Sequence, residues 1–183
     1  MSLLRFCEWL AATPGSIALH ESRYTFLAIL MIHVLTLSVL VGTAVMVDLR
    51  LLGLTLQRVP ASEVMAWLVP LSGAAFLVMI ASGSLLFYAA PVREYQNLFF
   101  RLKMVTLALV VTNAWVFHRT VYRTVADWDM YPVPPRGARV AGGLSLLLWA
   151  VMITLGRMIP YQMYWFDCSS QPQSAIVNFL MGC

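Results

Sequence analysis

The sequence predicts an all-α integral membrane protein, a four-helix bundle preceded by a short interfacial helix. Of its 183 residues, 61% are hydrophobic and only 11% are charged, against roughly 25% charged residues in soluble domains. The apolar residues gather in four long runs that carry almost no charge. About 20 apolar residues in a helix suffice to cross the hydrocarbon layer of a lipid bilayer. This composition excludes a disordered chain, a fibrous chain and a conventional soluble globule.

The first segment, residues 2–10, is expected to lie at the membrane surface. Its leucines share one helical face, whereas Arg5 and Glu8 fall on another, which is the pattern of an interfacial helix. The run from Thr13 to Ser16 contains Pro and Gly and ends this helix. Ser16 is then expected to cap the helix that follows.

Four membrane spans follow along a single membrane domain that takes in the whole chain, 1–183. Their predicted ranges are 24–47, 64–91, 101–122 and 139–161, with a C-terminal tail at 167–183. The first range alone reaches roughly 36 Å as a helix. The third span has a short uncharged stretch, so it is expected to extend past Lys103 and Arg119, whose long side chains can reach the headgroups.

The distribution of basic residues predicts the orientation in a bacterial inner membrane. Four spans place both termini on one side. With Lys103 and Arg157 set aside as partly intramembrane, that side carries four basic residues and the loop side carries six. Cytoplasmic loops are enriched in Lys and Arg, so the termini are predicted to be periplasmic. The net charge of +4 then reflects loop anchoring, and no nucleic-acid partner is expected.

Polar residues inside the spans are the functional candidates, because ionisable groups are costly there. These are His33, Lys103, His118 and Arg157. By helix rise, His33 and Arg157 both lie roughly 12–15 Å from the terminus side, and Ser82 and Ser84 are expected at a similar depth. No carboxylate is expected inside a span, since Asp48 and Glu63 are interpreted as loop charges. A carboxylate-driven pump is therefore not predicted.

The two histidines of these spans point to heme b. Imidazoles from two helices can hold one heme iron inside a bundle, and Arg157 and Lys103 would neutralise propionates or bind a quinone. His118 is expected to lie about 5–10 Å deeper than His33, an offset that helix tilt would have to absorb. His20 is interpreted as a surface residue.

The three cysteines do not predict a metal site, because they form no CxxC motif and no cluster with histidine. Cys168 and Cys183 would be able to form a disulfide if the termini are periplasmic. The sequence leaves the presence of this bond open.

Three segments carry a family resemblance. They are His33 to Leu35 leading to Asp48–Gly53, Phe100 to Lys103 leading to Asn113–Arg119, and Gly156 to Tyr161. Together they resemble a family of small, uncharacterised bacterial inner-membrane proteins with four spans, over most of residues 10–161. Pro160 departs from that family's usual Ala in the last motif. The resemblance implies the same four-span fold.

A more distant resemblance concerns other four-helix membrane proteins. A His early in the first span and a basic-Leu-Lys motif before the third resemble copper-resistance membrane proteins, cytochrome b561-like proteins and the HemJ-type protoporphyrinogen oxidase. In the HemJ type, the His of the first span and the Lys of the third span are considered functionally important. Those two positions match His33 and Lys103 here.

The leading functional hypothesis is a b-type cytochrome-like subunit that carries electrons between a periplasmic partner and quinone. His33 would ligate heme, and His118 would be the second ligand or line a second site. The first alternative is a cofactor-free anchor or accessory subunit, in contact with other subunits of a membrane complex or with further copies of itself. The second alternative is a HemJ-like heme-binding oxidase. Whether the protein is an enzyme therefore stays open.

Overall fold

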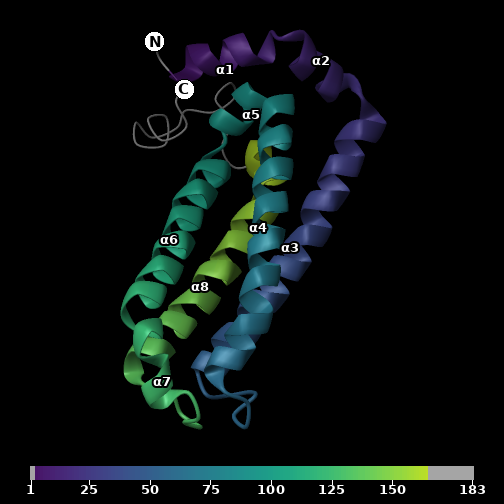
Figure 1. Cartoon of the computed structure of the whole chain (residues 1–183). Helices are drawn as coiled ribbons and strands as arrows, with labels where there is room; N and C mark the ends of the chain where they lie inside the picture. The colour runs from purple at the N-terminus through teal and green to yellow at the C-terminus, as the bar shows by residue number, and fades with distance from the viewer. Residues whose placement is uncertain (1–2, 165–183) are drawn as a thin grey trace, which may run out of the picture. The chain divides into compact units, whose positions relative to one another are not determined.

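The computed structural model describes residues 3–164, and no strand occurs among them. The helices are α1 (Leu3–Ala11), α2 (Pro14–Glu21), α3 (Arg23–Leu51), α4 (Ala61–Ala89), α5 (Pro91–Tyr95), α6 (Leu98–Thr120), η1 (Tyr122–Thr124), α7 (Val125–Trp128), α8 (Arg136–Met158) and η2 (Ile159–Tyr164) (Figure 1). Helices α3, α4, α6 and α8 lie in the four segments that are long and apolar enough to cross a membrane. The predicted all-α class with four membrane helices and a short N-terminal helix is confirmed.

The helix ends differ from the predicted span limits by a few residues. Helix α3 continues to Leu51, four residues beyond the predicted end. Helix α4 ends at Ala89, because Pro91 opens the short helix α5. Helix α6 begins at Leu98 after Asn97, whose side-chain oxygen accepts a hydrogen bond from the Phe100 amide at 3.0 Å. An unpaired helix-start amide is satisfied in this way. The predicted tail, with Cys168 and Cys183, lies outside the described residues.

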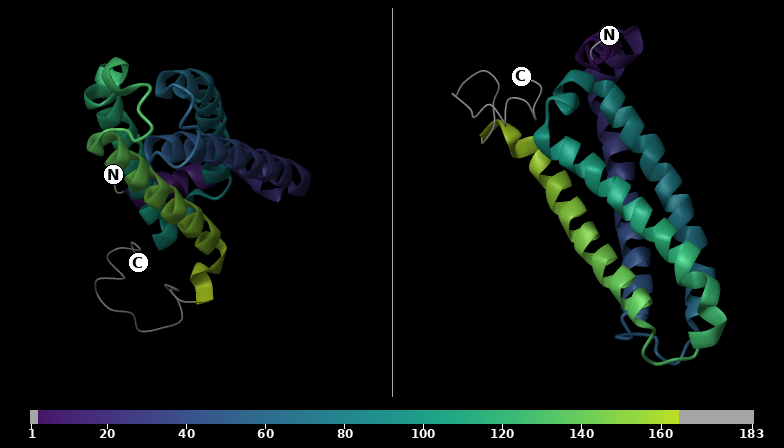
Figure 2. Two further views of the ribbon diagram at one scale, coloured as in Figure 1. Left: turned by 90° about the horizontal axis from the view of Figure 1, so that it is seen from below. Right: turned by 90° about the vertical axis from the view of Figure 1, so that its left-hand side faces the viewer.

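The contacts within the chain divide it into two compact units. Among the described residues, the terminal unit comprises 3–34, 80–105 and 153–164. The loop unit comprises 35–79 and 106–152. It contains the connections that follow α3 and precede α8, and Figure 2 shows these two connections side by side.

The loop unit has two apolar clusters. One is formed by Leu40, Ala75, Trp149 and Met152, from α3, α4 and α8. The other is formed by Leu51, Ala61, Met65, Trp128 and Ala138. Gly142 lets α8 approach α3 closely, since a Cβ atom there would lie 3.0 Å from the Asp48 carbonyl oxygen. Small residues at such crossings allow the close packing that holds membrane helices together.

Arg50 ties the two connections of the loop unit together. Its side chain is 1% exposed. The guanidinium donates to the carbonyl oxygens of Val59 and Asp129, both at 3.1 Å, and of Tyr131 at 3.5 Å. Five donors in a fixed fork suit arginine to such a role. Arg50 therefore acts as a structural clamp, although the sequence counted it as a basic loop residue.

The same connections start helix α4 and fix a turn. The Asp129 carboxylate accepts hydrogen bonds from the Ser62 amide at 2.7 Å and the Ser62 hydroxyl at 2.6 Å, which caps the first turn of α4. Gly53 has a φ of +74° and approaches the Pro132 carbonyl so closely that a Cβ atom would lie 2.9 Å from that oxygen. Only glycine fits this position without strain.

Asp48 corrects the expectation that no carboxylate lies inside a span. It belongs to the last turns of α3 and is only 5% exposed. The carboxylate hydrogen-bonds Ser145 of α8, and its Oδ2 atom has no partner among the described residues. Asp48 is buried because α3 continues past residue 47 and packs its final turn against α8.

In the terminal unit, α1 and α2 pack against the end of α4 and against α5. The hydroxyl groups of Thr13 and Tyr88 lie 2.8 Å apart, and the Ser16 hydroxyl donates to the Tyr88 carbonyl oxygen at 2.7 Å. Thr13 is the residue that caps α2, so the prediction that Ser16 caps it is wrong. Pro14 occupies the first helical position, where the missing amide hydrogen costs nothing. Burial raises the pKa of the Cys7 thiol, so this cysteine stays protonated and poorly reactive.

Replacing Arg50 tests the clamp. We expect Arg50→Ala to lower the free energy of unfolding by about 3 kcal/mol, because each buried carbonyl left without a partner costs ~1–3 kcal/mol. Thermal unfolding of the full chain in detergent, followed by circular dichroism, measures the effect. The exposed Arg58 of the same connection is the matched control. Equal melting temperatures for Arg50→Ala and Arg58→Ala would contradict the clamp.

Candidate functional site

A polar cluster lies inside the terminal unit and draws on all four long helices. His33 comes from α3, Ser82 and Gly83 from α4, Lys103 from α6 and Gly156 from α8. We call these five residues the His33 site. Its members are far apart along the chain, and each of the helices that carry them is apolar around them. Polar groups set among apolar helices in this way are functional candidates.

Ser82 and Gly83 position the ring of His33. The Nδ1 atom of His33 lies 2.9 Å from the Ser82 hydroxyl, which is itself 5% exposed. At Gly83 a Cβ atom would lie 3.3 Å from Cε1 of the ring. A larger residue at position 83 would therefore push the ring away. The Ser82 hydroxyl and the absence of a side chain at Gly83 together orient the imidazole of His33.

The orientation of His33 leaves its second ring nitrogen available. Among the described residues, Nε2 has no hydrogen-bond partner, and the side chain is half-buried. A histidine that ligates a metal typically uses one ring nitrogen for the metal and the other for a hydrogen bond that fixes the ring. Ser82 supplies the second of these interactions, so Nε2 is suited to a ligand.

Lys103 brings a positive charge to the same cluster. Its charge lies close enough to His33 and to Glu94 to act on both side chains. At Gly156 a Cβ atom would lie 3.8 Å from Nζ of Lys103, so the ammonium group rests against the α8 backbone. Within the part of the chain that the structure describes, this half-buried ammonium group makes no ion pair and no hydrogen bond. It is therefore suited to an anionic group of a ligand.

Arg157 belongs to the terminal unit, but its side chain contacts Tyr161, four residues further along the chain. Its guanidinium donates to the Tyr161 hydroxyl at 3.1 Å and lies 5.3 Å from the centre of that ring. The side chain is exposed. The charge of Lys103 acts on His33, whereas the Arg157 side chain is directed to Tyr161. Ser84 is also exposed, so only Ser82 of the two serines joins the site.

His118 belongs to the loop unit and has a different environment. It lies in the last turn of α6, is exposed, and stacks on Tyr122 with ring centres 5.1 Å apart. Fifteen residues of α6 separate it from Lys103, which is roughly 22 Å of helix. Of the four predicted site residues, His33, Lys103 and Arg157 are thus in one unit and His118 is in the other.

Several polar residues of the terminal unit lie near the N-terminal end of α6. Glu94 is buried and pairs with Arg93 at 3.1 Å. Arg101 donates to the Tyr95 carbonyl oxygen at 2.7 Å and lies over that ring at 4.4 Å. The Asn97 amide donates to the Ile159 carbonyl oxygen at 3.0 Å, which joins the start of α6 to the end of α8. The sequence carries no signal for the contact between Asn97 and Ile159, because it joins segments remote in the chain.

The donor set limits the kinds of metal that this site can hold. No group of three or more His, Cys, Asp or Glu side chains in residues 3–164 has the arrangement of a metal site. A zinc or mononuclear iron centre built from protein ligands alone is not supported there. A single histidine with a nearby lysine fits a metal that arrives with its own equatorial ligands, as in heme.

Comparison with known proteins identifies a family and leaves the activity open. Residues 17–162 match DUF6644, a family of unknown function. This match runs from within α2 to within η2 and includes every member of the His33 site. No curated protein and no solved structure matches the chain.

The hydrogen bond between Ser82 and His33 is open to a direct test. In the full chain, which has three histidines, we expect Ser82→Ala to move the ¹⁵N side-chain signals of His33 only, because Nδ1 loses its partner. Solution NMR of ¹⁵N-histidine-labelled protein in detergent measures this change. Ser84→Ala is the matched control, since Ser84 is exposed. If both variants shift the His33 signals equally, the contact is not the one described.

Proposed function

Because the chain belongs to DUF6644, a family of unknown function, we propose its function from the His33 site alone: it is a b-type cytochrome-like membrane protein that holds one heme b at His33. One observation carries the proposal. The site places an imidazole nitrogen and an ammonium group near each other, and neither has a partner among the described residues. Heme is a ligand that needs both, since its iron takes an imidazole and its propionates take cations.

The residues of this chain would have separate roles. Nε2 of His33 would bind the iron, and Ser82 would hold the ring through Nδ1 and so set its orientation. Lys103 would neutralise a propionate, and Arg157 would supply a second positive charge on the same helix as Gly156. When bound, the heme would supply one-electron redox chemistry. The apolar helices around the site would exclude water from it.

His118 is not part of this proposed ligand set. The length of α6 between Lys103 and His118 and the stacking of His118 on Tyr122 favour a separate role for it. The proposal therefore keeps His33 as the residue that would bind the iron and gives His118 no role in holding the heme. In the cell, the protein would exchange electrons between a periplasmic partner and the quinone pool of a bacterial inner membrane.

A second candidate function is favoured by the proximity of two charged or polar side chains. His33 and Lys103 are the two positions that match the HemJ-type oxidase, and they lie in the same unit within reach of each other's charge. In a HemJ-like enzyme the substrate is a porphyrinogen, whose carboxylates would also need a cation such as Lys103. The electron-transfer subunit and the oxidase would then share one heme site. Lys103 would pair with a heme propionate in the first and with a carboxylate of the porphyrinogen in the second.

Absorption spectra of single variants test both functions. The full chain is produced with heme supplied and purified in detergent. We expect a Soret band in the wild type and in His118→Ala, and none in His33→Ala. Loss of a charge-assisted hydrogen bond costs about 1.5–3 kcal/mol, so Lys103→Ala should weaken heme binding roughly tenfold or more, whereas Lys103→Arg should keep most of the affinity.

The same experiment separates the alternatives. If Lys103→Ala keeps its heme but no longer binds an added porphyrinogen, the oxidase is favoured over the electron carrier. A wild-type protein that folds, as judged by circular dichroism, but shows no Soret band would contradict both heme functions. It would then favour the cofactor-free anchor or accessory subunit, whose lipid-facing and subunit-facing residues are the exposed apolar side chains of the spans.

A further inference from the structure

The terminal unit also contains a cavity, which is separate from the His33 site. It has a volume of about 390 Å³ and lies between α1 and α2 on one side and the end of α4 and α5 on the other. Cavities that bind small molecules begin at about 300 Å³. The docking of α2 is firm, because Thr13 and Ser16 both bind Tyr88. The walls of the cavity are therefore held in place by hydrogen bonds.

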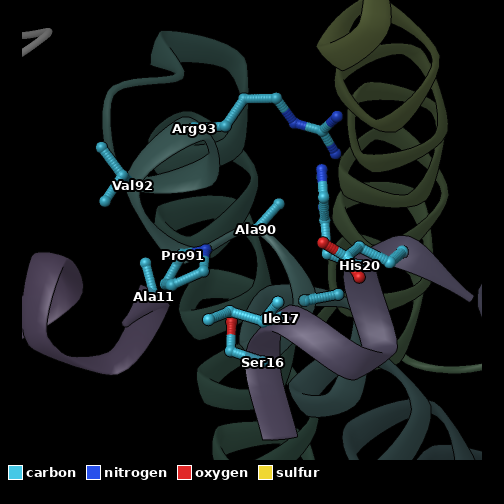
Figure 3. A pocket seen from close by; sticks show the side chains of 10 residues that line it. Ala11, Ser16, Ile17, His20, Ala90, Pro91, Val92 and Arg93 are labelled. Atoms are coloured by element: carbon cyan, nitrogen blue, oxygen red, sulfur yellow. The ribbon is translucent and has the colours of Figure 1, made fainter. Parts of the chain in front are cut away.

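The lining of this cavity is apolar with a polar rim. Its floor is made by Ala11, Ile17, Ala89, Ala90, Pro91 and Val92. His20 and Arg93 stand at the rim, and Figure 3 shows that their nitrogen-bearing ends point toward each other. Glu21 also lines the cavity. Two convergent hydrogen-bond donors above an apolar floor suit a flat ring that carries carbonyl oxygens.

The charges at the rim favour a neutral ligand over a phosphate. Arg93 is already paired with Glu94 at 3.1 Å, and Glu21 adds a second carboxylate. A phosphate headgroup would meet these two negative charges, whereas the carbonyl oxygens of a neutral ring would need only donors. Arg93 keeps donors free for that purpose, since a guanidinium has five N–H groups.

The position of the cavity fits a ligand that lives in the membrane. It adjoins the end of α4 at Ala89 and the residues just before α3, so it opens where two apolar spans end. Along α4, Ser82 precedes Ala89 by seven residues, or about 10 Å of helix. A ring in this cavity would thus lie roughly two helical turns from the residue that holds His33.

We infer that this cavity binds the headgroup of an isoprenoid quinone, with His20 and Arg93 donating to its carbonyl oxygens. The inference rests on the proposed function in one respect: it assigns the electron-exchange partner of the heme site. The apolar floor takes the ring, and the isoprenoid tail passes into the lipid beside α4. His20, interpreted as a surface residue from the sequence, becomes a binding residue only because α2 docks on the end of α4 through Tyr88.

Calorimetric titration of the full chain in detergent with decylubiquinone tests this inference. We expect His20→Ala and Arg93→Ala each to weaken binding at least about tenfold, as expected for one lost hydrogen bond to a strong donor. Ile17→Trp, which fills the cavity and removes no donor, should abolish binding. His118→Ala and Arg23→Ala are the matched controls, because neither residue lines the cavity, and both should bind as the wild type does.

A second titration uses dihexanoyl-phosphatidylglycerol as a probe for a lipid headgroup. Binding of this lipid with the same sensitivity to His20, Arg93 and Ile17, and without quinone binding, would overturn the inference in favour of a phosphate site. Quinone binding that ignores all three variants would also overturn it. The heme spectrum is read on the same samples, so loss of the Soret band and loss of quinone binding are separate results.

Discussion

Hydrocarbon offers no hydrogen bonds, so each polar group in a span needs a partner within the protein. In the loop unit the Ser72 and Thr43 hydroxyls bind each other at 2.6 Å, and the Asn113 amide binds the Ala141 carbonyl oxygen at 3.0 Å. Arg50 binds three carbonyl oxygens. Among residues 3–164, Oδ2 of Asp48 lacks such a partner, and within the His33 site so do Nε2 of His33 and the ammonium group of Lys103. A ligand that supplies a metal and an acid satisfies the two groups of the His33 site.

The two units differ in the polar contacts that they contain. In the loop unit, Arg50 and Asp129 hold the helix ends through hydrogen bonds to backbone groups and to Ser62. In the terminal unit, a cavity and a polar cluster keep donors available. The candidate ligand contacts thus lie in the terminal unit. Binding sites commonly sit on less tightly packed parts of a rigid scaffold.

Much of the fold was predictable, because membrane helices are specified by composition and length. The four spans and the N-terminal helix follow from the apolar runs, and the cost of an imidazole inside such a run makes His33 a candidate. Contacts between remote segments were not predictable. From the sequence, Arg50 is a basic loop residue, and only the structure shows that it binds the Tyr131 carbonyl oxygen. Likewise, Lys103 is expected to reach the headgroups, and only the structure shows that its ammonium group lies beside Gly156. The sequence predicts a depth for Arg157 by helix rise, but depth does not reveal that its side chain turns toward Tyr161.

The central claim is that Nε2 of His33 binds the iron of one heme. Its most direct test is chemical rescue of a variant that lacks the ring. The full-length His33→Gly protein is purified with heme present and titrated with free imidazole, while the absorption spectrum is recorded. The account predicts that His33→Gly has no bound heme without imidazole and regains the wild-type Soret band when imidazole occupies the vacated space beside Ser82. A His33→Gly protein that binds heme with an unchanged spectrum before any imidazole is added would contradict it.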